Sequence, residues 1–231
     1  MGEIITFVGL DVHKETITVA PAPRRLWSYR QRAPTRFRMA LVRTVAVFCG
    51  ARDGFDPAYR RAAASLGRRL AGAGIGVVYG GGRVGLMGVL ADAVLAVGGR
   101  IVGVIPEGLR KPEIAHPGLS GQVVTRDLAS RKQRMFDLAD AFVALPGGIG
   151  TLDETIEMLT WRQLGVHAKP VLICDVAGSA ASFVGFVEAA IAQGFAGAEV
   201  REMFEVLPGV EAVLARLQAS SAAKRSSQWT L

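Results

Sequence analysis

The stretch LPGGIGTLDE, residues 145–154, combines three glycines with two carboxylates. Glycine costs conformational entropy and proline breaks helices, so this composition does not serve stability. It follows the strand-like run DAFVAL and precedes a helical pattern. Backbone N–H groups at such a helix start can bind an anion, which would place the Glu154 carboxylate beside it. The spacing from Thr151 to Glu154 also fits a capping box, in which the glutamate bonds back to the cap residue.

A group of cations opens a second helical pattern, SRKQRMFDLAD, which starts at Ser130 or one or two residues before it. Arg131, Lys132 and Arg134 fall in its predicted first turn, where the helix macrodipole disfavours positive charge. An anionic ligand or a carboxylate partner would explain them, because arginine offers a planar bidentate donor. Glu154 is the expected carboxylate partner of this group, and a plain solvated helix face is the alternative.

A second glycine-rich stretch, YGGGRVGLMG, also lies between a strand-like run and a helical pattern. Gly80, Gly82 and Gly85 satisfy Gly-x-Gly-x-x-Gly, the dinucleotide fingerprint. The stretch follows the second strand of the pattern rather than the first, and Glu107, in a proline-flanked loop, is the acid available for a ribose. Gly80, Gly81 and Gly82 are therefore candidates either for phosphate binding or for a tight turn.

The elements that position these residues alternate regularly from Thr44 onward. Short apolar, β-branched runs are separated by helical patterns, which predicts an α/β fold. We expect a Rossmann-like, doubly wound, mainly parallel sheet with helices on both faces. Such sheets bind ligands at the carboxyl ends of their strands, where both glycine clusters fall. This domain is predicted over residues 41–220, followed by a flexible tail at 221–231.

Residues 1–40 do not share the alternating pattern. Their segment FVGLDVHKETITVA resembles the opening strand of a family of insertion-sequence transposases, in which Asp11 would be one of several metal-binding carboxylates. Nothing downstream supplies the other carboxylates. We interpret residues 1–40 as a fused or mis-started leader without a function of its own, and an arginine-rich arm that contacts nucleic acid is the alternative.

The net charge of +7 is carried by the ends of the chain. Residues 1–20 carry −2, residues 21–43 carry +7 and the tail carries +2, so residues 44–220 are neutral. A nucleic-acid-binding fold normally has a basic face on the domain itself, so the charge argues against a nucleic-acid partner.

The cysteines, the histidines and the hydropathy of the sequence argue against a disulfide-linked protein, a metal site and a membrane protein. Cys49 and Cys174 lie in apolar runs and are expected to be free thiols in a reducing cytoplasm. With three scattered histidines, we expect no metal site. No apolar run approaches the length of a membrane-spanning helix, so we expect a cytoplasmic protein without a membrane partner.

The stretches GGGRVGLMG, SRKQRMFDLADAFVALPGGIGTLDET and LTWRQLGVHAKPV together resemble the Lonely-Guy family, the cytokinin-activating phosphoribohydrolases. Many members of that family carry an older lysine decarboxylase label. The resemblance covers roughly residues 44–218. It implies a Rossmann-like sheet, a homodimer or larger homo-oligomer, and no cofactor. It also implies hydrolysis of the N-glycosidic bond of a purine nucleoside 5′-monophosphate, with adenine or an N6-modified adenine as the base, to the free base and ribose 5-phosphate.

The resemblance assigns roles position by position, with Arg131 and Glu154 as the catalytic pair. The substrate-binding positions that it implies are Glu113, Lys132, Gly148, Ile149, Gly150, Thr151, Leu152, Asp153 and Thr160. The sequence differs from the usual family pattern at three positions that affect the contact with the sugar and the substrate preference. Asp153 replaces a second glutamate, Ile149 replaces a frequent tyrosine, and Ala51 replaces a usual serine.

Three other functions are kept as alternatives. A non-catalytic nucleotide-binding or sensing module on the same fold would bind the nucleotide without releasing its base. An oxidoreductase would bind NAD at the first glycine loop. A lysine decarboxylase would need a cofactor-bearing lysine, for which the domain offers Lys111, Lys132 and Lys169.

Overall fold

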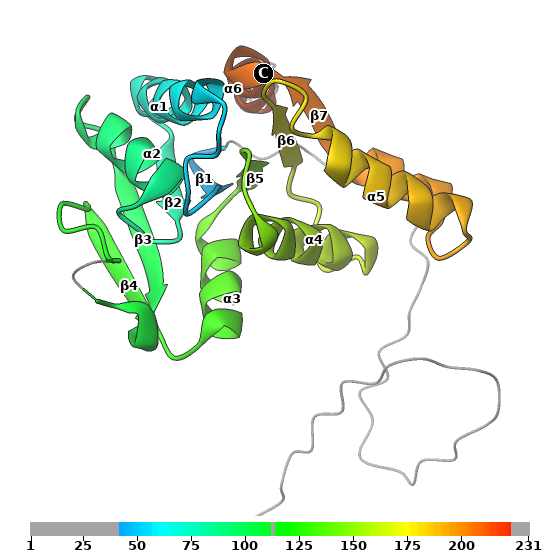
Figure 1. Ribbon diagram of the computed structural model, residues 1–231, viewed down its shortest axis with the longest axis horizontal. Helices are drawn as coiled ribbons and strands as arrows, with labels where there is room; N and C mark the ends of the chain where they lie inside the picture. Colours follow the sequence, from blue (N-terminus) through cyan, green and yellow to red (C-terminus); the bar gives the residue numbers. More distant parts are fainter. Residues whose placement is uncertain (1–41, 112–113, 223–231) are drawn as a thin grey trace, which may run out of the picture. The chain divides into compact units, whose positions relative to one another are not determined.

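The computed structural model describes residues 42–111 and 114–222, and its elements confirm the predicted α/β alternation (Figure 1). The predicted leader at 1–40 and the tail from residue 223 lie outside the described residues. Helix α6 continues to Ala222, two residues past the predicted end of the domain. The strands are β1 (Thr44–Phe48), β2 (Gly76–Tyr79), β3 (Ile101–Pro106), β4 (Gly121–Thr125), β5 (Ala141–Ala144), β6 (Val171–Asp175) and β7 (Glu205–Pro208), and the helices are α1 (Pro57–Gly72), α2 (Gly85–Leu95), α3 (Leu128–Leu138), α4 (Ile149–Gln163), α5 (Ala181–Ala192) and α6 (Gly209–Ala222).

The strands form a parallel sheet in the order β4-β3-β2-β1-β5-β6-β7. From β1 the chain first builds the sheet outward through β2, β3 and β4, and then returns to β5 on the other side of β1. Strands β1 and β5 therefore meet at the topological switch point, where doubly wound sheets bind ligands. Their register pairs Phe48 with Ala144, which brings the loops after both strands side by side.

Helices cover both faces of the sheet, as predicted (Figure 1). Helices α1, α2 and α6 bury Leu66, Leu90 and Leu217 against one face, together with Val45 and Val47 of β1. Helices α3, α4 and α5 cover the other face, where the intervening strand residues point. Successive residues of a strand face opposite sides, so the apolar β1 run serves two separate cores.

Helix α3 starts within the predicted range, whereas helix α4 starts before the Thr151 cap that the capping box would require. Helix α3 begins at Leu128, because the Asp127 carboxylate accepts a hydrogen bond from the Ser130 N–H at 2.7 Å and caps the helix. Arg131 is therefore the fourth helical residue, and the macrodipole acts on this cation less than predicted, since its effect fades beyond the first turn.

Helix α4 begins at Ile149, with Gly148 as its N-cap and no side-chain cap. The first intrahelical bond runs from the Leu152 N–H to the Gly148 carbonyl at 3.1 Å. The capping-box interpretation is therefore wrong, because Thr151 and Glu154 both lie inside the helix.

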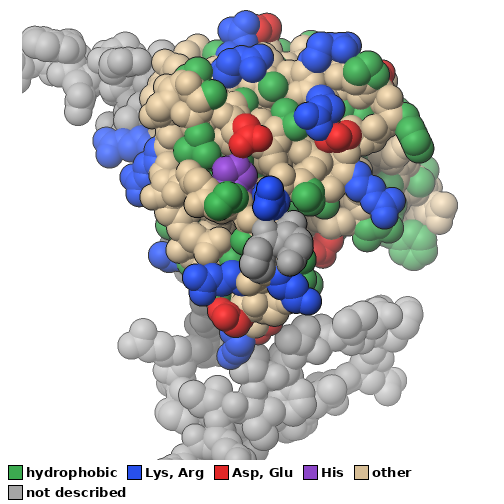
Figure 2. Space-filling model, turned by 60° about the vertical axis from the view of Figure 1, so that its left-hand side comes forward, with side chains coloured by type: hydrophobic (Ala, Val, Ile, Leu, Met, Phe, Trp, Pro, Cys, Tyr) green, Lys and Arg blue, Asp and Glu red, His purple; other side chains and the backbone are tan. Residues whose placement is uncertain are grey.

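The described surface carries mixed charge. On the face in Figure 2, Lys and Arg side chains are spread out, with acidic and apolar side chains between them. Among the described residues, no helix combines the length and apolar composition needed to cross a bilayer. Within the same residues, no group of three His, Cys, Asp or Glu side chains is arranged to hold a metal ion.

Candidate active site

A pocket of about 880 Å³ opens at the carboxyl ends of the central strands. It is lined by the loops after β1, β2, β5 and β6, and by the first turns of α2, α4 and α5. The pocket therefore lies at the switch point between β1 and β5, as the fold predicts for a ligand site.

Glycine allows the loops after β1 and β5 to touch through their backbones. The Gly50 N–H donates to the Pro146 carbonyl at 3.1 Å. A Cβ on Gly147 would lie 2.9 Å from the Gly50 nitrogen and would collide with the Thr151 side chain. A side chain at residue 147 would therefore push apart the two loops that form the floor of the pocket.

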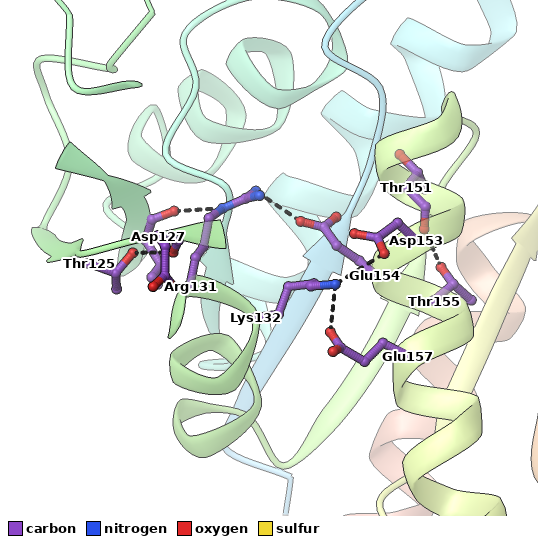
Figure 3. A network of polar contacts seen from close by, with 10 residues as sticks. Thr125, Asp127, Arg131, Lys132, Thr151, Asp153, Glu154, Thr155 and Glu157 are labelled. Atoms are coloured by element: carbon purple, nitrogen blue, oxygen red, sulfur yellow. Dashed lines mark hydrogen bonds and ion pairs between the residues drawn. The ribbon is translucent and has the colours of Figure 1, made fainter. Parts of the chain in front are cut away.

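Arg131 and Glu154 reach the pocket from the two helices α3 and α4 and form an ion pair there (Figure 3). The Arg131 Nη2 atom lies 2.9 Å from Glu154 Oε1, and the two side chains are only 16% and 9% exposed. Arg131 Nε also donates to the Val104 carbonyl at 3.0 Å. A Cβ on Gly80 would collide with Arg131 Nη2, so the bare backbone after β2 leaves room for the guanidinium.

The surroundings of Glu154 change its proton affinity. Burial raises the pKa of this carboxyl, the neighbouring Arg131 guanidinium lowers it, and the negative charge of Asp153 raises it again, with a net increase above the ordinary value. A carboxylate with a raised pKa binds a proton more strongly and is therefore a stronger base. Glu154 is therefore suited to accept a proton from a bound water.

Cys49 lines the same pocket, but its chemistry differs. Burial, followed by the charge of Glu154, raises the pKa of the thiol far above its usual range. The thiolate is the nucleophilic form of cysteine, so Cys49 is a neutral apolar neighbour of Glu154 rather than a nucleophile.

The first turn of helix α4 borders the pocket beside this pair. Gly148, Ile149, Gly150 and Thr151 all line the pocket. The first backbone N–H groups of a helix have no intrahelical acceptor, and the helix dipole gives this end a partial positive charge. The turn can therefore bind an anionic group close to Glu154.

Lys132 extends from α3 toward α4 next to this pair and forms ion pairs of its own with two carboxylates of α4 (Figure 3). Its Nζ lies 3.0 Å from Asp153 Oδ1 and 3.0 Å from Glu157 Oε2. Desolvation lowers the pKa of Lys132 and the two carboxylates raise it, with a net increase, so the lysine stays charged.

Comparison with known proteins places the chain in a family. A family model described as "Possible lysine decarboxylase" matches residues 87–217. A cytokinin riboside 5′-monophosphate phosphoribohydrolase of Rhodococcoides fascians is 42% identical over 178 residues, which cover 77% of this chain and 90% of that protein. The chain belongs to the Lonely-Guy family. Relatives with the same enzyme name from Oryza sativa subsp. japonica and Arabidopsis thaliana are 38% and 40% identical, over 78% and 75% of this chain and 75% and 80% of their own length.

Solved structures share the architecture of this Lonely-Guy chain. The molybdenum cofactor carrier protein of Chlamydomonas reinhardtii is 20% identical, with a TM-score of 0.59 over 78% of this chain and 98% of that one. The molybdenum cofactor binding protein of Rippkaea orientalis is 19% identical, with a TM-score of 0.58 over 76% and 95%. At this identity the likeness shows the fold alone, and the Rossmann-like prediction is confirmed.

The structure brings together only part of the site that the Lonely-Guy resemblance implies. Arg131, Glu154 and the turn 148–151 line one pocket. Leu152, Lys132, Asp153 and Thr160 do not line it, and Glu113 lies outside the described residues. Thr160 is exposed seven residues after Asp153 on α4, which places it on the same helical face as the Lys132 cluster.

Of the three glycines after β2, only Gly80 lines the pocket. The Gly81 carbonyl accepts from the His116 N–H at 3.0 Å, and a Cβ on Gly82 would lie 2.6 Å from Met87 Cε. The position of Gly81 and Gly82 therefore supports a turn that packs on its neighbours, and does not support the phosphate role considered for them.

Five polar residues of the pocket were not singled out from the sequence. Arg52 and Asp53 follow β1, and Tyr59 lies in the first turn of α1. Ser179 and Ser182 lie in the β6–α5 loop and in the first turn of α5. The rule that ligands bind beyond the carboxyl ends of central strands pointed to the β1 loop, because β1 opens the alternating pattern. The two serines carry no comparable signal in the sequence.

Proposed function

We propose that this Lonely-Guy chain hydrolyses the N-glycosidic bond of a purine nucleoside 5′-monophosphate, releasing adenine or an N6-modified adenine and ribose 5-phosphate. The observation that carries the proposal is the buried Arg131–Glu154 pair at 2.9 Å in a pocket that also holds the exposed start of helix α4. The names of the relatives support it, because they are phosphoribohydrolases of cytokinin riboside 5′-monophosphates.

The 5′-phosphate would bind at the start of helix α4. Free N–H groups of Ile149, Gly150 and Thr151 and the partial positive charge of the helix end suit a phosphate dianion. Binding energy from this remote group would hold the sugar in place at the reacting centre. This positioning would lower the activation free energy for breaking the N-glycosidic bond.

Glu154 would then act at the sugar. Breaking the bond develops positive charge on the ring, as in glycoside hydrolysis. A water oxygen bonds to C1′, the C1′–N bond breaks, and its electron pair leaves with the base. The proton lost by the water passes to the Glu154 carboxylate. The departing base takes up a proton from solvent, and Glu154 returns its proton to solvent before the next turnover. Arg131 keeps that carboxylate oriented, because its own guanidinium is fixed on the Val104 carbonyl.

The pH dependence of turnover reports on Glu154. Its pKa is raised in the free enzyme, and the base must be ionised, so kcat/KM should fall as the pH drops through a midpoint above the ordinary value of a glutamate. The charge of Asp153 contributes to the raised pKa, so Asp153→Asn should move this midpoint to lower pH.

Comparing the wild type with Asp153→Asn distinguishes titration of the enzyme from titration of the substrate. The phosphate of the substrate also titrates near neutral pH, but it is identical in both measurements. Profiles of kcat/KM that fall at the same pH in the wild type and in Asp153→Asn would contradict the assignment of the acid limb to Glu154.

The other functions have less support. A Schiff-base decarboxylase needs a lysine in its pocket, and none of the described lysines lines this one. Lys132 is held between Asp153 and Glu157, and Lys169 Nζ bonds to the Phe136 carbonyl at 2.7 Å. An NAD site on the first glycine loop would need Gly81 and Gly82 at the pocket, where they do not lie.

We also propose a homodimer or larger homo-oligomer that acts in the cytoplasm without a cofactor. Exposed apolar side chains on helices α3 and α4, Leu128 and Leu152, support a partner subunit on this side. Light scattering on the purified chain measures the assembly directly.

The decisive experiment identifies the products. The purified protein is incubated with AMP, isopentenyl-AMP and the other purine monophosphates, and the products are separated by chromatography. We expect free base and ribose 5-phosphate in equal amounts. Binding of the nucleotide without release of the base would instead establish the non-catalytic module on the same fold.

A further inference from the structure

The charged side chains that line the pocket are Arg52, Asp53, Arg131 and Glu154. Arg131 is paired with Glu154, and Asp53 Oδ2 lies 2.7 Å from Nη1 of Arg60. Within the part of the chain that the structure describes, the Arg52 guanidinium has no hydrogen bond or ion pair. The pocket therefore contains one cation whose charge is not balanced by a side-chain partner.

The loop that carries Arg52 is fixed by its neighbours. The Met87 N–H donates to the Gly50 carbonyl at 3.3 Å, which ties the loop to helix α2. The Asp56 carboxylate accepts from the Ala58 N–H at 2.7 Å and begins helix α1. Gly85 has no room for a Cβ because the backbone of Ala51 and Arg52 lies against it. These contacts fix the backbone of the loop, which carries the exposed Arg52 side chain at the pocket.

The sheet register places this position beside the start of helix α4. Phe48 of β1 pairs with Ala144 of β5, and the bond between Gly50 and Pro146 continues the contact beyond the strands. Arg52 follows Phe48 by four residues, just as Gly148 follows Ala144. The cation and the free N–H groups of α4 therefore border the same end of the pocket.

We propose that Arg52 binds the 5′-phosphate of the substrate together with the N-terminal turn of helix α4, and so sets the preference for phosphorylated substrates. This inference rests on the proposed function of the pocket. A phosphate monoester carries a charge of about −1.5 to −2 at neutral pH, whereas a helix end supplies roughly +0.5. Arg131 cannot make up the difference, because its charge already faces Glu154. Arg52 supplies a full positive charge and a bidentate donor that fits phosphate oxygens.

The proposal is tested with Arg52→Ala and Arg52→Lys. Each protein is titrated with ribose 5-phosphate in a calorimeter, and steady-state rates are measured with AMP. We expect Arg52→Ala to raise the Kd for ribose 5-phosphate and the KM for AMP by roughly 10- to 100-fold, the range for hydrogen bonds to charged groups. Arg52→Lys should recover part of the loss, because it keeps the charge but not the bidentate geometry.

Arg68→Ala is the matched control. Arg68 is exposed on helix α1 and does not line the pocket, so its removal changes the net charge equally and should leave both constants unchanged. Thermal unfolding of all three variants checks that the loop remains folded.

Two results would overturn the assignment of Arg52. One is an unchanged Kd and KM in a folded Arg52→Ala protein. The other is an equal loss of affinity for adenosine, which has no phosphate. The proposed function is judged separately: a wild-type protein that binds ribose 5-phosphate but never releases a base contradicts the hydrolase, while the phosphate titrations still decide the role of Arg52.

Discussion

Glu154→Gln is expected to lower kcat by roughly 10²- to 10⁴-fold, the range for loss of a general base. Glutamine has nearly the same shape, and its amide oxygen can still accept a hydrogen bond from Arg131 Nη2. It cannot accept the proton of the attacking water, and it brings no negative charge to the developing cation on the sugar. The loss should therefore appear in kcat, while the KM for the nucleotide changes little.

Folding of this variant distinguishes chemistry from stability. Helix α4 begins at Ile149 with Gly148 as its N-cap, so Glu154 plays no part in capping the helix. A cooperative unfolding transition should therefore persist in Glu154→Gln. Glu157→Gln is the control, because Glu157 lies one turn further along α4 and pairs with Lys132 outside the pocket. Rapid turnover in Glu154→Gln, measured as base released per enzyme, would remove Glu154 from the mechanism.

The meeting of Arg131 and Glu154 could be predicted because it follows from the order of the elements. Each residue lies in a helix that borders the carboxyl edge of a parallel sheet, and the arginine in a cluster of cations needed an anion. Their 2.9 Å contact agrees with that expectation. The predicted fold followed from the same alternation of apolar runs and helical patterns.

The start of helix α4 could not be predicted from local propensity. Glycine is a poor helix former, so the sequence around Gly150 favoured a later start. Contacts between distant segments decide otherwise, since the Gly50–Pro146 bond fixes the loop that leads into the helix. Tertiary packing here overrides propensity, and it leaves free N–H groups at the pocket.

The role of the glycines after β2 could not be predicted from local sequence either. A phosphate-binding turn and a packed turn have the same local sequence. The distinction comes from residues far away in the chain, because the Arg83 N–H donates to the Ile114 carbonyl at 2.8 Å and the His116 N–H donates to the Gly81 carbonyl at 3.0 Å. These bonds turn the stretch toward the loop before β4 and leave only Gly80 at the pocket.

The second large effect concerns the substrate. Adenosine should be cleaved with a kcat/KM roughly 10²- to 10⁴-fold below that of AMP, because it forgoes about two charge-assisted hydrogen bonds that the phosphate would make with the start of helix α4 and with Arg52. If this binding energy is used to position the sugar, phosphite dianion added in trans should restore part of the rate on adenosine, since it occupies the same site.

Chloride at equal ionic strength is the control. Equal rates on AMP and adenosine would show that the N–H groups after Gly148 do not hold the substrate. A slow reaction on adenosine that phosphite cannot accelerate would mean that the phosphate contributes affinity alone, and that Glu154 meets the sugar without help from the anion.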